Sequence, residues 1–303
     1  MRHRNHLKIY LALSATMIFW GLSFVATKVA LETFSPFTLI FARFAMASCL
    51  LLGLFLRRGI PSLTRTEHVK LFLVALFEPG LYFIFETIGL QHTSAPKAAL
   101  IIATVPVTVL IFAAMMLGER VTRTHVLGVA ISLAGIAVLI VGDPQFNWKL
   151  GGSLGGDLLI FGAVLSAALY IVCARDIGKS RSAMEITSIQ FLYGALLYAP
   201  ACLWELPQFH WQQISPRSLA ALIYLTVFAT VAAFLCYNYA LTRVPAARAA
   251  VFINAIPVVT AIAAWLMLGE TLTIIQIGGG AMVLLAVYWT NRSRMKPLAS
   301  RTA

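Results

Sequence analysis

Long apolar segments recur along the whole chain, and they constrain the fold more than any other feature of the sequence. A helix needs about 20 apolar residues to cross the hydrocarbon core of a bilayer. We predict ten such helices, at 8–30, 36–57, 69–90, 94–117, 122–142, 154–175, 185–205, 217–241, 245–268 and 272–291. Only 11% of the 303 residues are charged, against about 25% in soluble domains. Too few polar side chains remain to cover a soluble globule, so we predict an all-α integral membrane protein with ten transmembrane helices.

Basic residues alternate in number between successive loops. The two termini and the loops after even-numbered spans hold 18 Lys and Arg residues, whereas the other loops hold four. Cytoplasmic loops of membrane proteins are enriched in Lys and Arg. We therefore expect a multi-pass protein of the plasma (inner) membrane with both termini in the cytoplasm. The net charge of +12 is spread between the apolar runs rather than gathered on one face, so we do not expect nucleic-acid binding.

The two halves of the chain resemble each other. A shift of 151 residues aligns 96–128 with 247–279, and it superimposes the Leu-Gly-Glu turn at 117–119 on the one at 268–270. We predict two five-helix repeats, at 8–142 and 154–291. Because five is an odd number, the second repeat must enter the membrane in the inverted orientation. Inverted repeats are typical of alternating-access transporters, whose substrate sites lie near the midplane between the repeats.

Several short motifs carry a resemblance to a known family. They are Trp20-Gly21-Leu22-Ser23-Phe24, Arg43-Phe44, the segment Glu78-Pro79-Gly80-Leu81-Tyr82-Phe83 with Glu86, Ser94-Ala95 and the two Leu-Gly-Glu turns. With these motifs the chain resembles EamA-type transporters of the drug/metabolite transporter superfamily over nearly its whole length. The resemblance implies a secondary active transporter, not an enzyme, that exports a small metabolite such as an amino acid or a drug-like compound.

Two alternatives stay open at this point. A facilitator, importer or exchanger of a small polar metabolite would have the same fold. An intramembrane enzyme is a remote alternative, because it would need a nucleophile and a base at one depth. The sequence has no Walker A motif, so uphill transport would need an ion gradient, for which protons are the candidate.

Ionisable side chains inside the predicted spans are the first candidates for a functional site, because charge is costly in the bilayer core. Glu78, Tyr82 and Glu86 are spaced by four residues and share one helix face. Arg43 could pair with either carboxylate, but its depth favours an ion pair with Glu86. Glu78 then remains unpaired near the midplane, next to the helix-breaking Pro79. Buried carboxylates bind protons more readily than exposed ones, so Glu78 is our candidate for proton coupling or for binding a substrate amine.

Other polar and aromatic residues are weaker candidates for the substrate pathway. They are Trp20, Lys97, Tyr170, Tyr237 and Asn254. We expect a cavity between the repeats, lined by spans one, three, four, six, eight and nine, with Trp20 and Tyr82 facing it. We expect the glutamate of each Leu-Gly-Glu turn to lie in the first turn of the following helix. The four cysteines lie singly in apolar runs, so we predict no disulfide, metal site or cofactor, and the sequence does not specify an oligomeric state.

Overall fold

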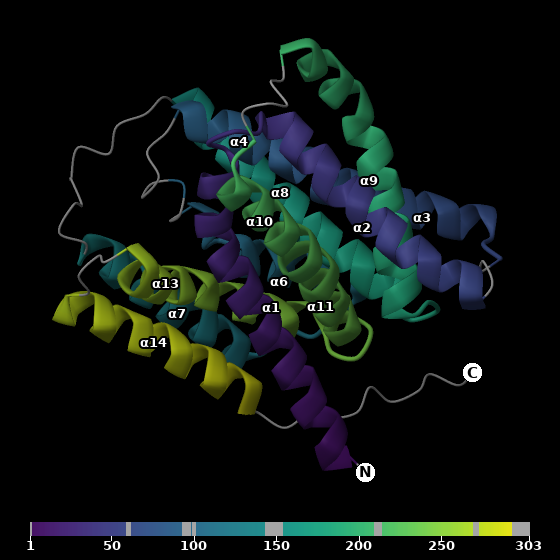
Figure 1. The fold of residues 1–303 in the computed structure, drawn as a ribbon. Helices are drawn as coiled ribbons and strands as arrows, with labels where there is room; N and C mark the ends of the chain where they lie inside the picture. Colours follow the sequence, from purple (N-terminus) through teal and green to yellow (C-terminus); the bar gives the residue numbers. More distant parts are fainter. Residues whose placement is uncertain are drawn as a thin grey trace.

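The computed structural model describes residues 2–58, 62–92, 98, 101–142, 154–208, 214–268 and 273–292, and within these ranges the regular structure is helical (Figure 1). Eight helical stretches are long and apolar enough to cross a membrane: Leu7–Thr27, Pro36–Gly53, Arg65–Gly89, Arg123–Val141, Leu154–Ile177, Ala183–Glu205, Pro216–Leu241 and Ala246–Ala263. Two shorter apolar helices are Val105–Leu117 and Ile274–Thr290. They fall within the fourth and tenth predicted spans.

The helices follow one another in a similar order in both halves. The first half contains α1 (Arg2–Ala30), α2 (Pro36–Arg58), α3 (Arg65–Ala75), η1 (Leu76–Leu81), α4 (Tyr82–His92), α6 (Val105–Leu117) and α7 (Arg123–Val141). The second half contains α8 (Leu154–Ile177), α9 (Ala183–Glu205), η2 (Leu206–Gln208), α10 (Pro216–Tyr224), η4 (Leu225–Ala232), α11 (Ala233–Leu241), α12 (Ala246–Val251), η5 (Phe252–Ala255), α13 (Ile256–Leu268) and α14 (Ile274–Arg292).

The third and eighth predicted spans each contain a π-helical segment. The π-helical segment η1 separates α3 from α4, and the π-helical segment η4 separates α10 from α11. Within η1, Glu78 has non-helical backbone angles (φ −146°, ψ 117°), and Pro79 has no N–H group for the helical ladder. A shift of 151 residues places all of η1 within η4, on residues 227–232. The π-helical segments therefore lie at corresponding places in the two halves, and η1 also has a kink in the backbone at Glu78.

The packing of the first half also corresponds to that of the second. Helix α1 packs against α10, η4 and α11, and α8 packs against α3, η1 and α4. In the same way α1 contacts α13, and α8 contacts α6. Two further pairs, α2 with α9 and α7 with α14, join equivalent helices of the two halves (Figure 1). The core therefore consists mainly of contacts between the halves.

The first Leu-Gly-Glu turn ends α6, because Gly118 is its C-cap in the left-handed conformation (φ 65°). The prediction for Glu119 is wrong. Helix α7 begins at Arg123 with its own N-cap, so Glu119 precedes its first turn. Instead, the Glu119 carboxylate accepts a hydrogen bond from the N–H of Ala246 (3.0 Å), at the start of α12. The glutamate thus stabilises a helix N-terminus, but one in the other half of the chain. Residues 269 and 270 of the second turn lie outside the described residues.

Candidate functional site

The break in the third span is held by side chains from α9. Because Pro79 interrupts the helical ladder, nearby carbonyl groups need other donors. The Gln190 side-chain amide donates to the Glu78 carbonyl (2.8 Å). The Tyr198 hydroxyl donates to the carbonyls of Pro79 (3.2 Å) and Gly80 (2.8 Å). The unusual backbone around Glu78 is therefore fixed by two buried donors from one neighbouring helix.

A single face of α9 is shaped to receive this break. Gln190, Gly194 and Tyr198 recur every four residues and so lie on that face. A Cβ atom at Gly194 would lie 2.7 Å from Cγ of Pro79, which is closer than van der Waals contact allows. The glycine thus lets α9 approach the proline closely enough for the two donors to reach their carbonyls.

Hydrogen bonds extend from Gln190 through the protein interior. The Asn238 amide donates to the side-chain oxygens of Thr187 (2.9 Å) and Gln190 (3.2 Å). The Tyr170 hydroxyl donates to the Asn238 oxygen (3.1 Å). These four side chains are buried, and hydrogen bonds in such an environment are strong enough to fix the relative positions of the groups that they join. They link α8, α9 and α11 to the backbone of Glu78.

The two carboxylates of the third span lie on either side of Tyr82 in the sequence, each four residues from it. The Tyr82 hydroxyl donates to Oε1 of Glu86 (3.1 Å). Glu78 and Glu86 are within electrostatic range of each other, and Tyr170 and Tyr237 are within range of Glu78. All three residues of the predicted stripe keep some accessible surface. The stripe therefore faces the interface between the halves at Glu78, and both carboxylates retain free acceptor capacity.

Arg43 is 6% exposed and does not form the predicted ion pair with Glu86. Its Nε and Nη2 groups donate to the Thr230 hydroxyl (3.3 and 3.1 Å), and its guanidinium lies 5.7 Å from the centroid of the Phe83 ring. The prediction of this ion pair assumed that the third span is a straight α-helix. The π-helical segment η1 lies between the start of that span and Glu86, and its backbone is kinked at Glu78. Arg43 still lies within electrostatic range of Glu86, so the group combines one cation with two carboxylates.

Arg43 and Gln190 make equivalent contacts in the two halves. A shift of 147 residues aligns them in sequence. Arg43 reaches from α2 to Thr230 in η4, and Gln190 reaches from α9 to the Glu78 carbonyl in η1. Each side chain therefore binds the π-helical segment of the opposite half, Arg43 at a side-chain hydroxyl and Gln190 at a backbone carbonyl.

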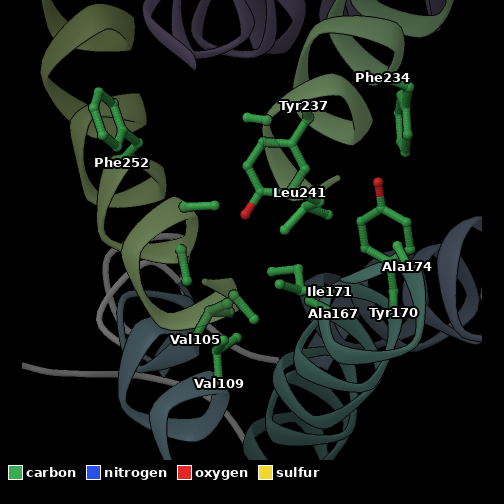
Figure 2. Packing of buried hydrophobic residues seen from close by; sticks show 14 of the residues in the cluster. Val105, Val109, Ala167, Tyr170, Ile171, Ala174, Phe234, Tyr237, Leu241 and Phe252 are labelled. Atoms are coloured by element: carbon green, nitrogen blue, oxygen red, sulfur yellow. The ribbon is translucent and has the colours of Figure 1, made fainter. Parts of the chain in front are cut away.

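Four aromatic side chains adjoin this polar group. The Trp20 ring lies 5.2 Å from both the Phe234 and the Tyr237 rings, measured between centroids, and Tyr170 stacks on Tyr237 at 6.5 Å. The Trp20 indole N–H donates to the Ala229 carbonyl of η4 (3.0 Å). Figure 2 shows the Tyr237 hydroxyl pointing among apolar side chains, and this buried oxygen has no hydrogen-bond partner among the described residues.

Of the two remaining candidates, the structure places only Asn254, and it places it outside this group. The Asn254 amide donates to the Ser132 hydroxyl on α7 (2.8 Å), so this side chain joins η5 to α7. Lys97 lies outside the described residues. The structure therefore gathers Trp20, Arg43, Glu78, Tyr82, Glu86, Tyr170 and Tyr237 around the two breaks.

Sequence reasoning missed the residues that support the break. They are Thr187, Gln190, Gly194, Tyr198 and Asn238. Pro79 already implied carbonyl groups without helical donors, so a search for buried donors at helical spacing would have found Gln190 and Tyr198. Asn238 had no comparable signal, because a lone amide within an apolar span does not reveal its partner.

Gln190→Leu is expected to lower the free energy of unfolding by about 1–3 kcal/mol, because the buried Glu78 carbonyl loses its donor. The melting temperature in detergent measures this loss. Leu192→Ala is the control, since that side chain is exposed on the same helix and its truncation disturbs no hydrogen bond. Equal melting temperatures for Gln190→Leu and the wild type would show that the contact contributes nothing.

The comparisons with known proteins agree with a membrane transporter. The model of the EamA-like transporter family matches residues 7–141 and 154–292, so the chain belongs to the EamA-like transporter family. It is accordingly a multi-pass membrane protein. A crystal structure with 18% sequence identity has the same fold, with a TM-score of 0.76 over 93% of this chain and 95% of the other.

Curated relatives carry transporter names. Two uncharacterized transporters of Archaeoglobus fulgidus are 28% and 30% identical, over 95% and 93% of this chain and 100% and 97% of their own lengths. A probable terminal-alkyne amino-acid exporter of Streptantibioticus cattleyicolor is 24% identical over 93% of this chain and 92% of its own. The relatives thus extend along nearly the whole chain.

Proposed function

We propose that this protein is a secondary active transporter that exports a small metabolite, such as an amino acid, by alternating access coupled to protons. The observation that carries the proposal is the group of Arg43, Glu78 and Glu86 at the break between α3 and α4. Ionisable residues at membrane depth are costly, and they cluster where substrates or protons pass. Broken helices with exposed backbone groups are a recurring component of transporter sites.

Ten membrane spans in two inverted repeats, 8–142 and 154–291, are part of this proposal. Support comes from the equivalent helix contacts of α1 and α8 and from the matching positions of η1 and η4. In alternating access the two repeats exchange their conformations. The central group, which consists of Arg43, Glu78 and Glu86, then becomes accessible first from one side of the membrane and then from the other.

The charges of the site favour a substrate that carries both an ammonium and a carboxylate group. Two carboxylates can receive the ammonium, and Arg43 can receive the carboxylate while it holds Thr230. The amino-acid exporter named among the relatives supports the same class of substrate. The aromatic side chains of Trp20 and Tyr237 would contact the remainder of the substrate.

Counterflow in proteoliposomes tests the proposal. Vesicles loaded with one unlabelled amino acid at a time should take up that labelled amino acid faster than empty vesicles. Arg43→Gln should reduce the exchange at least tenfold, whereas Arg217→Gln, at an exposed position on α10, should leave it unchanged. Absence of exchange for every amino acid would overturn the proposed substrate class.

Both termini are proposed to lie in the cytoplasm of the cell membrane. Single cysteines at Glu32 and Arg120, both exposed, should then react differently with a membrane-impermeant maleimide in a variant without the four native cysteines. We expect labelling of Glu32→Cys in intact cells, and of Arg120→Cys only after permeabilisation. The reverse pattern would contradict the orientation.

A further inference from the structure

A second site lies on the opposite side of α11 from the central group. Phe234, Tyr237, Asn238 and Leu241 form the buried face of this helix, whereas Leu235, Tyr239, Thr242 and Arg243 are half-buried or exposed. The latter four line a cavity of about 640 Å³ together with residues 178–184 of the α8–α9 connection. None of the residues that we assign to the substrate pathway lines this cavity.

The cavity is cationic at one end and apolar at the other. Lys179, Arg181 and Arg243 line it, and no carboxylate side chain does. Leu235 lies eight residues before Arg243, about 12 Å by the helical rise, and Met184 also lines the cavity. A cationic end followed by an apolar wall matches the order of groups in a phospholipid, from headgroup to acyl chain.

The charges around the cavity are only partly neutralised within the protein. Asp176 is shared between Lys179 (3.1 Å) and Lys70 (2.6 Å). Arg181 pairs with Glu67 (2.6 Å) and Glu185 (3.2 Å), so these two carboxylates already have a partner.

Arg243 differs from the other two cations, because no carboxylate of the described residues lies within 4.0 Å of its guanidinium. The guanidinium stacks on the Tyr239 ring at 3.6 Å, and Nη1 donates to the Tyr239 carbonyl (3.0 Å). Its position is thus fixed by its own helix, while its charge stays available to an anion. Stacked arginines of this kind recognise phosphate groups well.

We propose that this cavity binds the headgroup of an anionic phospholipid. Arg243 and Lys179 would contact the phosphate, and Leu235 and Met184 the start of the acyl chains. Basic pockets beside transmembrane helices on the cytoplasmic side are known to bind anionic lipid headgroups. The proposed orientation of the chain places this cavity in the inner leaflet, but binding itself does not depend on the transport activity.

Thermal shift of the purified protein in neutral detergent tests this proposal, with short-chain phosphatidylglycerol, short-chain phosphatidylcholine and inorganic phosphate as separate probes. Phosphatidylglycerol should raise the melting temperature with saturation, because a ligand stabilises the state that it binds. The other two probes should have little effect at the same concentration. An equal shift with phosphatidylcholine would overturn the recognition of charge, and an equal shift with phosphate would overturn the lipid as the source of the anion.

Arg243→Gln should weaken the apparent affinity for phosphatidylglycerol about fivefold, as expected for one cation near the membrane surface. Arg123→Gln is the matched control, since it removes an exposed arginine at the start of α7 and should leave the affinity unchanged. Arg243→Lys should retain only part of the affinity, because the ammonium keeps the charge but loses the stacking on Tyr239. Equal affinities for Arg243→Gln and Arg123→Gln would overturn the proposal.

Discussion

Glu78→Gln is expected to abolish accumulation of substrate driven by a pH gradient, while counterflow exchange persists within about twofold. A neutral amide cannot bind and release a proton, yet it retains the size and hydrogen-bonding capacity of the acid. The backbone at position 78 should stay in place, because Gln190 and Tyr198 bind backbone carbonyls rather than the carboxylate. Proteoliposomes with an imposed pH gradient measure accumulation, and the same vesicles without a gradient measure exchange.

Glu86→Gln is the companion variant for this experiment, because it neutralises the other carboxylate of the site and leaves the proposed coupling residue in place. Glu86 lies on the same face but already accepts a hydrogen bond from Tyr82, and an amide oxygen can accept it equally well. Since Arg43 is held by Thr230, this variant is also expected to keep nearly the wild-type melting temperature. If accumulation survives in Glu78→Gln and disappears in Glu86→Gln, Glu86 is the coupling residue and the proposal for Glu78 is wrong.

The membrane helices could be predicted from the sequence because burial in a bilayer depends on local composition. Runs of apolar residues and the placement of Lys and Arg are local signals, and eight predicted spans correspond to long apolar helices. The interruptions at η1 and η4 were harder to predict. Pro79 indicated the first, but the π-helical segment around Thr230 contains neither proline nor glycine. The segment η4 packs against α1 and α2, and such contacts between distant parts of the chain cannot be predicted from the local sequence.

Partners across the interface between the halves were the least predictable part of the site. The depth argument placed Arg43 nearest to Glu86 along the membrane normal, but a hydrogen bond also requires the right rotation about each helix axis. The break at η1 changes that rotation, and Thr230 becomes the neighbour of Arg43. Glu119 shows the same difficulty. The sequence predicts that this glutamate lies at a helix N-terminus, but the helix whose N-terminus it binds is α12, in the other half of the chain.

Glu119→Ala is expected to shift the protein toward a state that is open at the α12 end and to slow exchange about tenfold. Beyond its bond to Ala246, the carboxylate lies 3.6 Å from the Arg175 guanidinium, and Arg175 donates to the Leu241 carbonyl (2.8 Å). Glu119 thus joins the end of α6 to the ends of α8 and α11 and to the start of α12. Removing a capping carboxylate costs about 0.5–2 kcal/mol, and about 1.4 kcal/mol changes an equilibrium tenfold.

Spin labels at Arg123 and Arg243, one in each half, report this shift as a longer distance in pulsed electron resonance. The matched control is Glu185→Ala, which removes another capping carboxylate with an arginine partner, but one that caps its own helix α9. It should leave the distance unchanged, because its cap does not cross between the halves. In the proposed orientation the ends joined by Glu119 face the cytoplasm, so loss of the contact is expected to favour opening on that side. An unchanged distance and exchange rate in Glu119→Ala would mean that the contact is a static cap, and closure would then depend on apolar packing alone.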